Sequence, residues 1–187
     1  MTRYLICAML FFSFTAAVCQ APPNAPSTLM QPSHGAAGAV AGVHWVAPKG
    51  WSTQPPRQMR VATYSVPAAG GDAEGGECAV FFFGSGQGGN VDANIERWAA
   101  QFKEPGKPAR SAKKVNGLDV TLVQIAGTYL APSGPMMQSQ GEKSHYRLIG
   151  AIVAAPEGSV FFKLTGPAKT VAAAEPDFNA MVNTLSK

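Results

Sequence analysis

The stretch AVFFFGSGQGGNVDANIERW, residues 79–98, carries the pattern that decides the fold of this chain. An apolar run ends at Phe83, glycines follow at positions 84, 86 and 89 in the spacing GxGxxG, and an amphipathic segment begins at Val91. The order of strand, glycine turn and helix is also the context of a dinucleotide-binding motif. The question is therefore whether this turn binds a phosphate or only joins a strand to a helix.

Residues further along the chain argue against a dinucleotide site. Such a site needs a parallel βαβ unit with an acidic residue about 20 positions after the first glycine. Glu104 stands there, but at the end of the expected helix, and the strands that follow form an antiparallel hairpin around Asn116-Gly117. Asp92 and Glu96 lie early in the helix, where they would repel a phosphate. We therefore expect the glycines of residues 84–89 to supply backbone geometry, and we expect no cofactor.

The segments around this stretch predict an α+β domain with a mainly antiparallel sheet. The run Phe81–Phe83 does not alternate, as is typical of a central strand covered on both faces. Trp98 and its neighbours at helical spacing predict an amphipathic helix over 91–103, and Phe178 lies on the apolar face of a C-terminal helix that follows Pro167 and is interrupted at Pro176. Phe82, Trp98 and Phe178 are expected in the core. Strands are expected at 57–66, 78–83, 111–115, 118–130, 145–154 and 159–166, with a flexible loop at 131–144.

The first 42 residues are expected to lie outside the folded domain. Residues 1–19 combine a basic start, an apolar segment and small residues at positions 16 and 17, which is the pattern of a secretory signal peptide. The apolar segment is short for a membrane span, which needs about 20 residues. Residues 20–42 are rich in Pro, Ala, Gly and Ser and predict a disordered linker. Residues 43–187 then form a single globular α+β domain.

Cys19 leaves two outcomes open at the end of the signal. Ordinary cleavage near residues 17–21 is favoured, because Val18 stands where lipoprotein signals have Gly, Ala or Ser. The alternative is a lipid anchor at Cys19. Cys78 is then the thiol certain to remain, so no disulfide framework is expected. We expect an exported protein, periplasmic or extracellular, that has no transmembrane helix after processing and is tethered to a membrane only if Cys19 is lipidated.

The charge of the chain does not indicate a nucleic-acid partner. There are 15 Lys and Arg residues against 11 Asp and Glu residues, a net charge of +4. The cations between positions 103 and 114 gather in one segment, but no aromatic residues are interleaved there to stack on bases. We interpret this segment as a solvated loop and strand edge, where lysines discourage edge pairing.

Residues suited to catalysis or metal binding are few. Ser85 stands in FGSGQ and lacks the GxSxG pattern of a nucleophile elbow. His44 and His145 begin expected strands and could meet each other, or Glu77 and Cys78, but no pair has metal-ligand spacing on one element. We therefore expect no catalytic residues and no metal site. The alternative hypothesis is a small exported hydrolase or metal enzyme that uses His44, His145 and the Gly84–Gly89 loop.

Four residues are candidates for a ligand or partner surface: Gln87, Trp51, Met136 and Met137. Gln87 lies within the glycine loop. Trp51 could form an aromatic platform or pack in the core. Met136 and Met137 are adaptable apolar side chains in a polar loop, which suits either a partner surface or packing on their own domain. The favoured function is an exported non-catalytic module that binds a protein partner, an envelope component or a small ligand.

Four segments carry a resemblance to a known group of proteins: VHWVAPKGW, CAVFFFGSGQGGNVDANIERWAAQF, VNGLDVTLV and FFKLTGPAKTV. They resemble an uncharacterised family of exported bacterial proteins and lipoproteins, over about residues 43–185. The fold of that family is similar to the Mog1/PsbP class of α/β/α sandwich. The resemblance implies this fold, and it implies no reaction and no catalytic residues.

Overall fold

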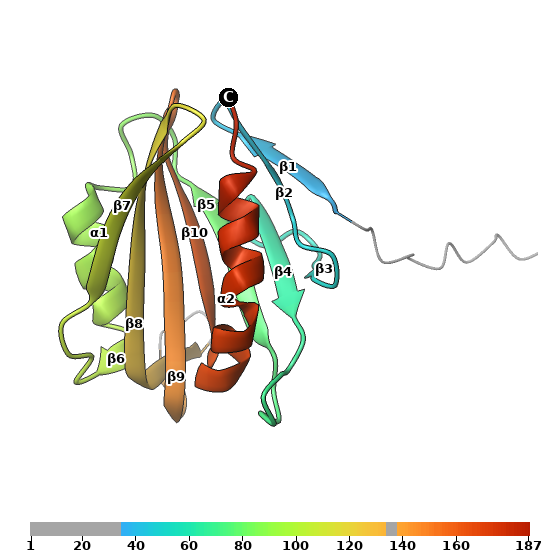
Figure 1. Cartoon of the computed structure of the whole chain (residues 1–187). Coiled ribbons are helices and arrows are strands. Elements are labelled where there is room, and N and C mark those ends of the chain that lie inside the picture. Colours follow the sequence, from blue (N-terminus) through green and yellow to red (C-terminus); the bar gives the residue numbers. More distant parts are fainter. Residues whose placement is uncertain (1–34, 134–137) are drawn as a thin grey trace, which may run out of the picture. The chain divides into compact units, whose positions relative to one another are not determined.

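The computed structural model describes residues 35–133 and 138–187 of the chain. Within these ranges one antiparallel sheet has the strand order β3-β4-β5-β10-β9-β8-β6, with β7 also paired to β8 (Figure 1). Strands β1 (Ala37–Val40) and β2 (Val43–Val46) form a separate small sheet. The large sheet consists of β3 (Ser52–Thr53), β4 (Ala62–Val66), β5 (Gly76–Phe82), β6 (Phe102–Lys103), β7 (Ala109–Val115), β8 (Leu118–Ser133), β9 (Gln138–Ala155) and β10 (Gly158–Pro167).

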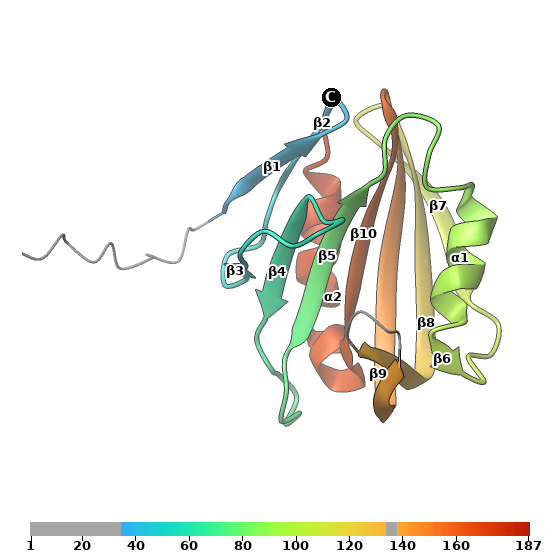
Figure 2. The same cartoon turned by 180° about the vertical axis from the view of Figure 1, so that it is seen from behind.

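Two helices cover opposite faces of the large sheet. Helix α2 (Ala168–Asn183) lies in front of the sheet in Figure 1, and α1 (Val91–Ala99) lies on the face seen in Figure 2. The predicted class, a mainly antiparallel sheet packed by an amphipathic helix and a C-terminal helix, is confirmed. Both ladders of the hairpins after α1 are antiparallel, and Asn116 and Gly117 have the positive φ angles, 47° and 81°, that the tight turn requires.

The sheet separates two hydrophobic clusters. Val160, Phe162 and Leu164 of β10 point into the larger cluster under α2, and Phe161 between them points into the smaller cluster under α1. Period-two alternation of a strand buried on both faces produces this division. The larger cluster contains Phe178, which is fully buried, and the smaller one contains Trp98, 6% exposed, as predicted. Phe82, by contrast, is only partly buried.

Helix α1 begins where the glycine segment ends and is shorter than the sequence predicts. The Asn90 side chain caps it by accepting a hydrogen bond of 2.8 Å from the Ala93 backbone N–H. The expected helix reached Lys103, but Ala100 is the C-cap, and Phe102–Lys103 forms β6 instead. Pairing of β6 with β8 explains the difference, because it satisfies backbone groups that a further helical turn would have used.

Helix α2 runs through Pro176 without a break, which corrects the expected interruption there. A proline inside a helix costs about 3 kcal/mol, since it removes one hydrogen bond and crowds the preceding turn. The Pro176 side chain is exposed, whereas Ala174 and Phe178 on either side are buried against the sheet. We attribute the continuity of the helix to this buried face, because burial of a large aromatic side chain offsets a loss of this size.

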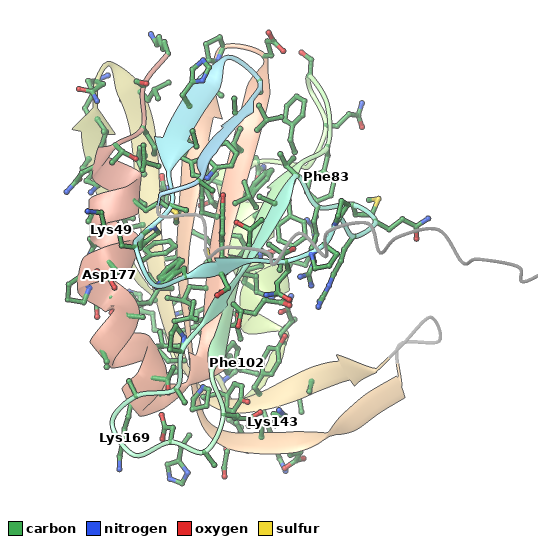
Figure 3. All side chains as sticks on the ribbon, turned by 90° about the vertical axis from the view of Figure 1, so that its right-hand side faces the viewer. Lys49, Phe83, Phe102, Lys143, Lys169 and Asp177 are labelled. Carbon is green, nitrogen blue, oxygen red and sulfur yellow. The ribbon has the colours of Figure 1, made fainter. Side chains whose placement is uncertain are left out.

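Strands β8 and β9 continue through most of the segment expected as a flexible loop. Figure 3 shows this hairpin bending away from the sheet on the face opposite α2, with Lys143 near its base. Gly127 pairs with Tyr146 and Tyr129 with Lys143, so two residues of β9 oppose one of β8. This is a β-bulge, which bends the strand. Residues 128–133 and 138–145, beyond the bulge, are here called the hairpin arm.

The described strands begin before residue 43, within the segment expected as a linker. Strand β1 pairs with β2 from Ala37 to Val40, and Ala41 is 7% exposed. The physical reason is Trp45: Gly38 lies flat against its indole ring and helps to cover it. The signal peptide expected at 1–19, Cys19 and the first part of the expected linker lie outside the described residues. Within the described residues, no helix is long and apolar enough to cross a membrane.

Candidate ligand-binding cleft

A cleft lies on the α1 face of the sheet, beside the helix. Helix α1 contacts β8, and Figure 2 shows β5 and β10 to one side of it, uncovered by a helix on this face. The cleft there has a volume of about 460 Å³, within the range of small-molecule sites. Its lining comes from β5, β10, the hairpin arm, the end of α1 and the β3–β4 loop: Arg60, Glu77, Ala79, Phe81, Ala100, Gln101, Tyr129, Leu130, Ala131, Lys163 and Thr165.

The hollow follows from the sizes of paired residues across three strands. Lys163 of β10 stands between Ala79 of β5 and Gly150 of β9 in the register of the sheet. On the β9 side the indole ring of Trp98 fills the space above Gly150. On the β5 side Ala79 offers only a methyl group and no helix covers it. The floor of the cleft is therefore the small side chain beside Lys163.

Lys163 is the central cation of the cleft. Its Nζ donates a hydrogen bond to Gln101 Oε1 and lies 5.8 Å from the centre of the Tyr129 ring. Within the described residues, no carboxylate lies within salt-bridge distance of Nζ. Burial lowers the pKa of Lys163 to about 8, with a further lowering from Arg60 opposed by Glu77. The amine therefore keeps its proton at neutral pH but has little of the solvation of a surface lysine.

The carboxylate of the cleft is already paired. Glu77 Oε1 accepts a hydrogen bond of 2.7 Å from Arg60, and Oε2 accepts one of 2.9 Å from Arg57. The Arg60 guanidinium also lies over the Phe81 ring, 5.7 Å from its centre. Glu77 thus fixes the two arginines at the rim and does not neutralise Lys163. The described part of this site holds three cations and one carboxylate.

Two hydroxyl groups complete the polar lining. Thr165 Oγ1 is buried and has no hydrogen-bond partner in the described structure. Burial raises the pKa of Tyr129, whose hydroxyl lies 3.5 Å from Gln101 Oε1. A buried hydroxyl without a partner costs free energy.

A smaller cavity of about 170 Å³ adjoins the cleft under α1. It shares Phe81, Gln101 and Lys163 with the larger cleft. Its remaining lining is mostly aromatic, with Phe83, Trp98 and Phe161 beside Asn94 and Arg97. Lys163 therefore stands where the larger cleft, with its few polar groups, meets an aromatic hollow.

The hairpin arm is held beside the cleft by a small polar cluster. Lys143 Nζ donates to Glu74 Oε2 at 2.7 Å, and the Tyr146 hydroxyl donates to Glu74 Oε1 at 2.6 Å. These two hydrogen bonds lower the pKa of Glu74. Tyr146 stacks on Tyr129, with ring centres 5.6 Å apart. The wall that Tyr129 contributes to the cleft is thus fixed through Tyr146 to the β4–β5 loop.

The residues predicted for a ligand or partner surface are not brought together in one place. Gln87 is exposed on the glycine loop. Trp51 is 6% exposed and packs near Tyr64, so the core-packing alternative holds for it. Met136 and Met137 lie outside the described residues.

His44 and His145 lie near opposite ends of strand β9. The β1–β2 turn next to His44 contacts the β9–β10 turn, where Glu157 N donates to Ala41 O at 3.4 Å. His145 stands ten residues before Ala155 along β9, roughly 33 Å at about 3.3 Å per residue. A shared proton relay needs hydrogen-bond reach, so the alternative hypothesis loses its acid–base pair. Within the described ranges, no three His, Cys, Asp or Glu side chains are grouped to hold a metal ion.

His145 has a backbone role at the β-bulge. Its φ is 56°, and it is one of the two β9 residues that oppose Thr128. Histidine is among the non-glycine residues that tolerate this conformation best. Its side chain is exposed.

The glycine segment has the backbone role predicted for it. All four glycines between residues 84 and 89 have positive φ, from 69° to 99°. A Cβ at Gly88 would stand 2.9 Å from the Phe83 ring and 3.0 Å from the Phe161 ring. Close packing of the turn on these rings accounts for glycine at this position.

Sequence reasoning missed the cleft residues, although one signal for Lys163 is visible. A lysine inside the apolar run VFFKL has the same parity as Phe161, so in a strand it must point to the same buried face. Arg60, Gln101 and Tyr129 carry no such signal, because their convergence depends on the bend of the hairpin arm and on where α1 ends.

The fold defined by this sheet and its two helices is of the Mog1/PsbP class. The chain is similar to the solution structure of the cyanobacterial PsbP protein CyanoP from Synechocystis sp. PCC 6803, with a TM-score of 0.51 and 9% identity over 88% of this chain and 98% of that one. It is also similar to the crystal structure of PA94, a protein of unknown function from Pseudomonas aeruginosa, with a TM-score of 0.46 and 16% identity over 81% and 95% of the two chains. No protein-family model matches the sequence, and a comparison with curated proteins finds no match.

Proposed function

We propose that this protein is an exported, non-catalytic module that binds a small molecule in the cleft between α1, β5, β10 and the hairpin arm. The observation that carries the proposal is the hollow of about 460 Å³ around Lys163. A concave site with apolar walls and a few convergent polar groups is the usual form of a small-molecule site. Of the three kinds of partner considered from the sequence, a small ligand is the one that such a hollow favours.

The arrangement of side chains supports binding more than catalysis. Both oxygens of Glu77 accept hydrogen bonds from Arg57 and Arg60, and Lys163 has an amide oxygen of Gln101 as its hydrogen-bond partner. A general base or a nucleophile needs a second group positioned to take or relay its proton. In the described cleft, no such group is hydrogen-bonded to Lys163, whose partner is the amide oxygen of Gln101.

Occupancy of the cleft is tested on protein purified from its native cells by native mass spectrometry. The wild-type protein is expected to carry a small molecule that dissociates on denaturation. Ala79→Leu adds three carbon atoms to the floor of the cleft and should abolish this extra mass while the protein keeps its fold. Ala154→Leu makes the same change at an exposed position of β9 and should leave the bound mass in place.

The same measurement can reject the proposal. Wild-type protein without a bound molecule, and without saturable binding from a small-molecule library screened by NMR, would remove the basis for a ligand site. Equal occupancy in wild type and Ala79→Leu would place the ligand elsewhere.

We also propose that residues 1–19 direct export and are removed. The support is the sequence of that segment, with its basic start and apolar run. The intact mass of the protein from its native cells distinguishes the outcomes. Ordinary cleavage gives a chain beginning between residues 17 and 21, lipidation gives a chain beginning at Cys19 with added acyl mass that Cys19→Ser removes, and the full-length mass contradicts export.

A further inference from the structure

The ligand class of the cleft can be argued one step further, on the basis of the proposed function. We propose that the cleft binds an amphipathic anion, a carboxylic acid with an apolar body, whose acidic group accepts hydrogen bonds from Lys163 Nζ. The apolar body then lies along the aromatic side chains next to Lys163.

The charge balance of the cleft favours an anion. Both oxygens of Glu77 are taken by Arg57 and Arg60, at 2.9 and 2.7 Å. Lys163 is left without a carboxylate partner among the described residues, in surroundings that penalise its charge. A buried cation is stable only when it is paired, so a ligand carboxylate supplies what this part of the protein lacks.

The donors in the cleft match the acceptors of a carboxylate. An ammonium group has three N–H donors, and Gln101 Oε1 takes one of those of Lys163. The two other N–H groups of this ammonium can each donate to an oxygen of one acidic group.

The groups facing Lys163 leave it protonated at neutral pH. Arg60 of the β3–β4 loop and Glu77 of β5 act on its pKa in opposite directions, and burial is the larger cause of the lowering to about 8. From the other elements, Gln101 and Tyr129 face it, and Arg97 of α1 lines the adjoining cavity. An anion bound at Lys163 would raise this pKa, so binding takes up protons near pH 8.

The aromatic cavity gives the ligand its apolar part. Phe83, Trp98 and Phe161 line a hollow that begins at Lys163 and runs under α1. Phe161 is 1% exposed and Trp98 6%, so this wall is part of the hydrophobic core. A purely polar anion such as phosphate would leave this surface unused, whereas an alkyl or aryl body would cover it.

The test compares three probes that share one chain length: decanoate, decanol and decyltrimethylammonium. Binding to the purified protein is followed by titration calorimetry, and its place by chemical-shift changes of Phe81, Gln101 and Lys163. Decanoate is expected to bind in the cleft at least about tenfold more tightly than decanol, as expected for a hydrogen bond to a charged group. The ammonium probe is expected not to bind there.

One variant and two controls identify the group responsible. Lys163→Met keeps an unbranched side chain, one atom shorter, and removes its charge, and Thr165→Val keeps the shape and removes the hydroxyl. Lys163→Met should weaken decanoate by about tenfold or more and change decanol by less than about twofold. Thr165→Val should change the binding of neither probe by more than about twofold, because its hydroxyl is closed to solvent. Lys114→Met removes a similar charge from the exposed edge strand β7 and should change neither.

The outcomes separate this inference from the proposed function. Equal binding of decanoate and decanol in the cleft, or decanoate binding unaffected by Lys163→Met, overturns the anion inference and leaves a ligand-binding cleft. Tighter binding of the cation overturns it as well. No binding of decanoate, while native protein carries a molecule that Ala79→Leu removes, also overturns the inference and keeps the proposed function.

Discussion

The indole ring of Trp98 lies directly against the backbone of Gly150, so that a Cβ on residue 150 would collide with three ring carbons, Cζ3, Cη2 and Cε3. Neither side can yield easily, because the ring is buried and β9 is a central strand. Gly150→Ala is therefore expected to lower the free energy of unfolding by about 1–3 kcal/mol, which is typical of overpacking. Chemical denaturation measures the change.

A double-mutant cycle checks the cause of that loss. Trp98→Phe shortens the ring, so Gly150→Ala should cost less in this background than in the wild type. If the effects of the two substitutions are strictly additive, the contact between the ring and residue 150 is not the reason why this position requires glycine.

Gly88 and Gly86 form a matched pair for testing the glycine turn. Both have positive φ, 88° and 69°, but a Cβ at Gly88 meets the Phe83 and Phe161 rings, whereas one at Gly86 meets nothing within 4 Å. Each alanine carries the strain of a positive φ, about 1 kcal/mol or more, and Gly88→Ala adds the collision. We expect the melting temperature to fall further for Gly88→Ala. Equal melting temperatures of the two variants would show that close packing at Gly88 does not affect stability.

Strand β1 is expected to contribute to stability, contrary to what the sequence suggests. A chain that begins at Gly42 loses the strand that pairs with β2 and the cover that Gly38 gives Trp45. Its melting temperature should lie below that of a chain beginning at residue 35, because the indole ring becomes exposed to water. The emission of Trp45 should shift to longer wavelength on the same truncation. Identical melting curves for the two chains would show that β1 adds nothing.

Lys163 is expected to make stability depend on pH between about 8 and 10. Its pKa is about 8 in the folded protein and 10.5 as the reference value for an unfolded chain. The unfolded chain binds more protons in this interval, so this residue makes the free energy of unfolding rise with pH, by about 2 kcal/mol in all. The measurement is urea denaturation of the wild type and of Lys163→Met at pH 7, 8, 9 and 10.

The comparison with the variant isolates the lysine from other groups. Burial raises the pKa of Cys78, which makes stability fall above about pH 9 in both proteins and cancels in their difference. The excess stability of Lys163→Met over the wild type should therefore shrink as pH rises. A Lys163→Arg chain stays charged throughout and should show no such convergence with Lys163→Met. A difference independent of pH would show that Lys163 is solvated.

The parts of the fold that could be predicted from sequence are those decided by local pattern. The unalternating run at Phe81–Phe83 indicated a central strand, the spacing around Trp98 indicated a helix, and Asn116-Gly117 marked a hairpin. The errors came from tertiary effects. Residues expected at the end of α1 form β6 instead, because they pair with β8. Helix α2 continues through Pro176, because Phe178 is packed in the core. The segment expected as a loop forms the hairpin arm beyond a β-bulge.

The candidate site depends on the same tertiary effects, which is why the sequence did not reveal it. Lys163 lies in a recognisable strand, but the cleft beside it depends on the residues that pair with it. These are Ala79 of β5 and Gly150 of β9, and the Trp98 ring occupies the space above Gly150. Register across three strands cannot be read from one of them. His145, singled out for chemistry, proved to be the residue that bends β9.

The side chains of β10 alternate between two faces of the sheet, so odd and even positions have different roles. Phe162 and Leu164 are committed to the closed core under α2, whereas Phe161, Lys163 and Thr165 face α1 and the cleft. Substitutions at positions 163 and 165 can therefore change what the cleft accepts without reaching the larger core through the sheet. A scaffold of this kind is suited to redesign and to divergence. Substitutions at two positions of β10, two residues apart, could change the specificity of the cleft, while the residues on the opposite face of the strand keep the folding free energy.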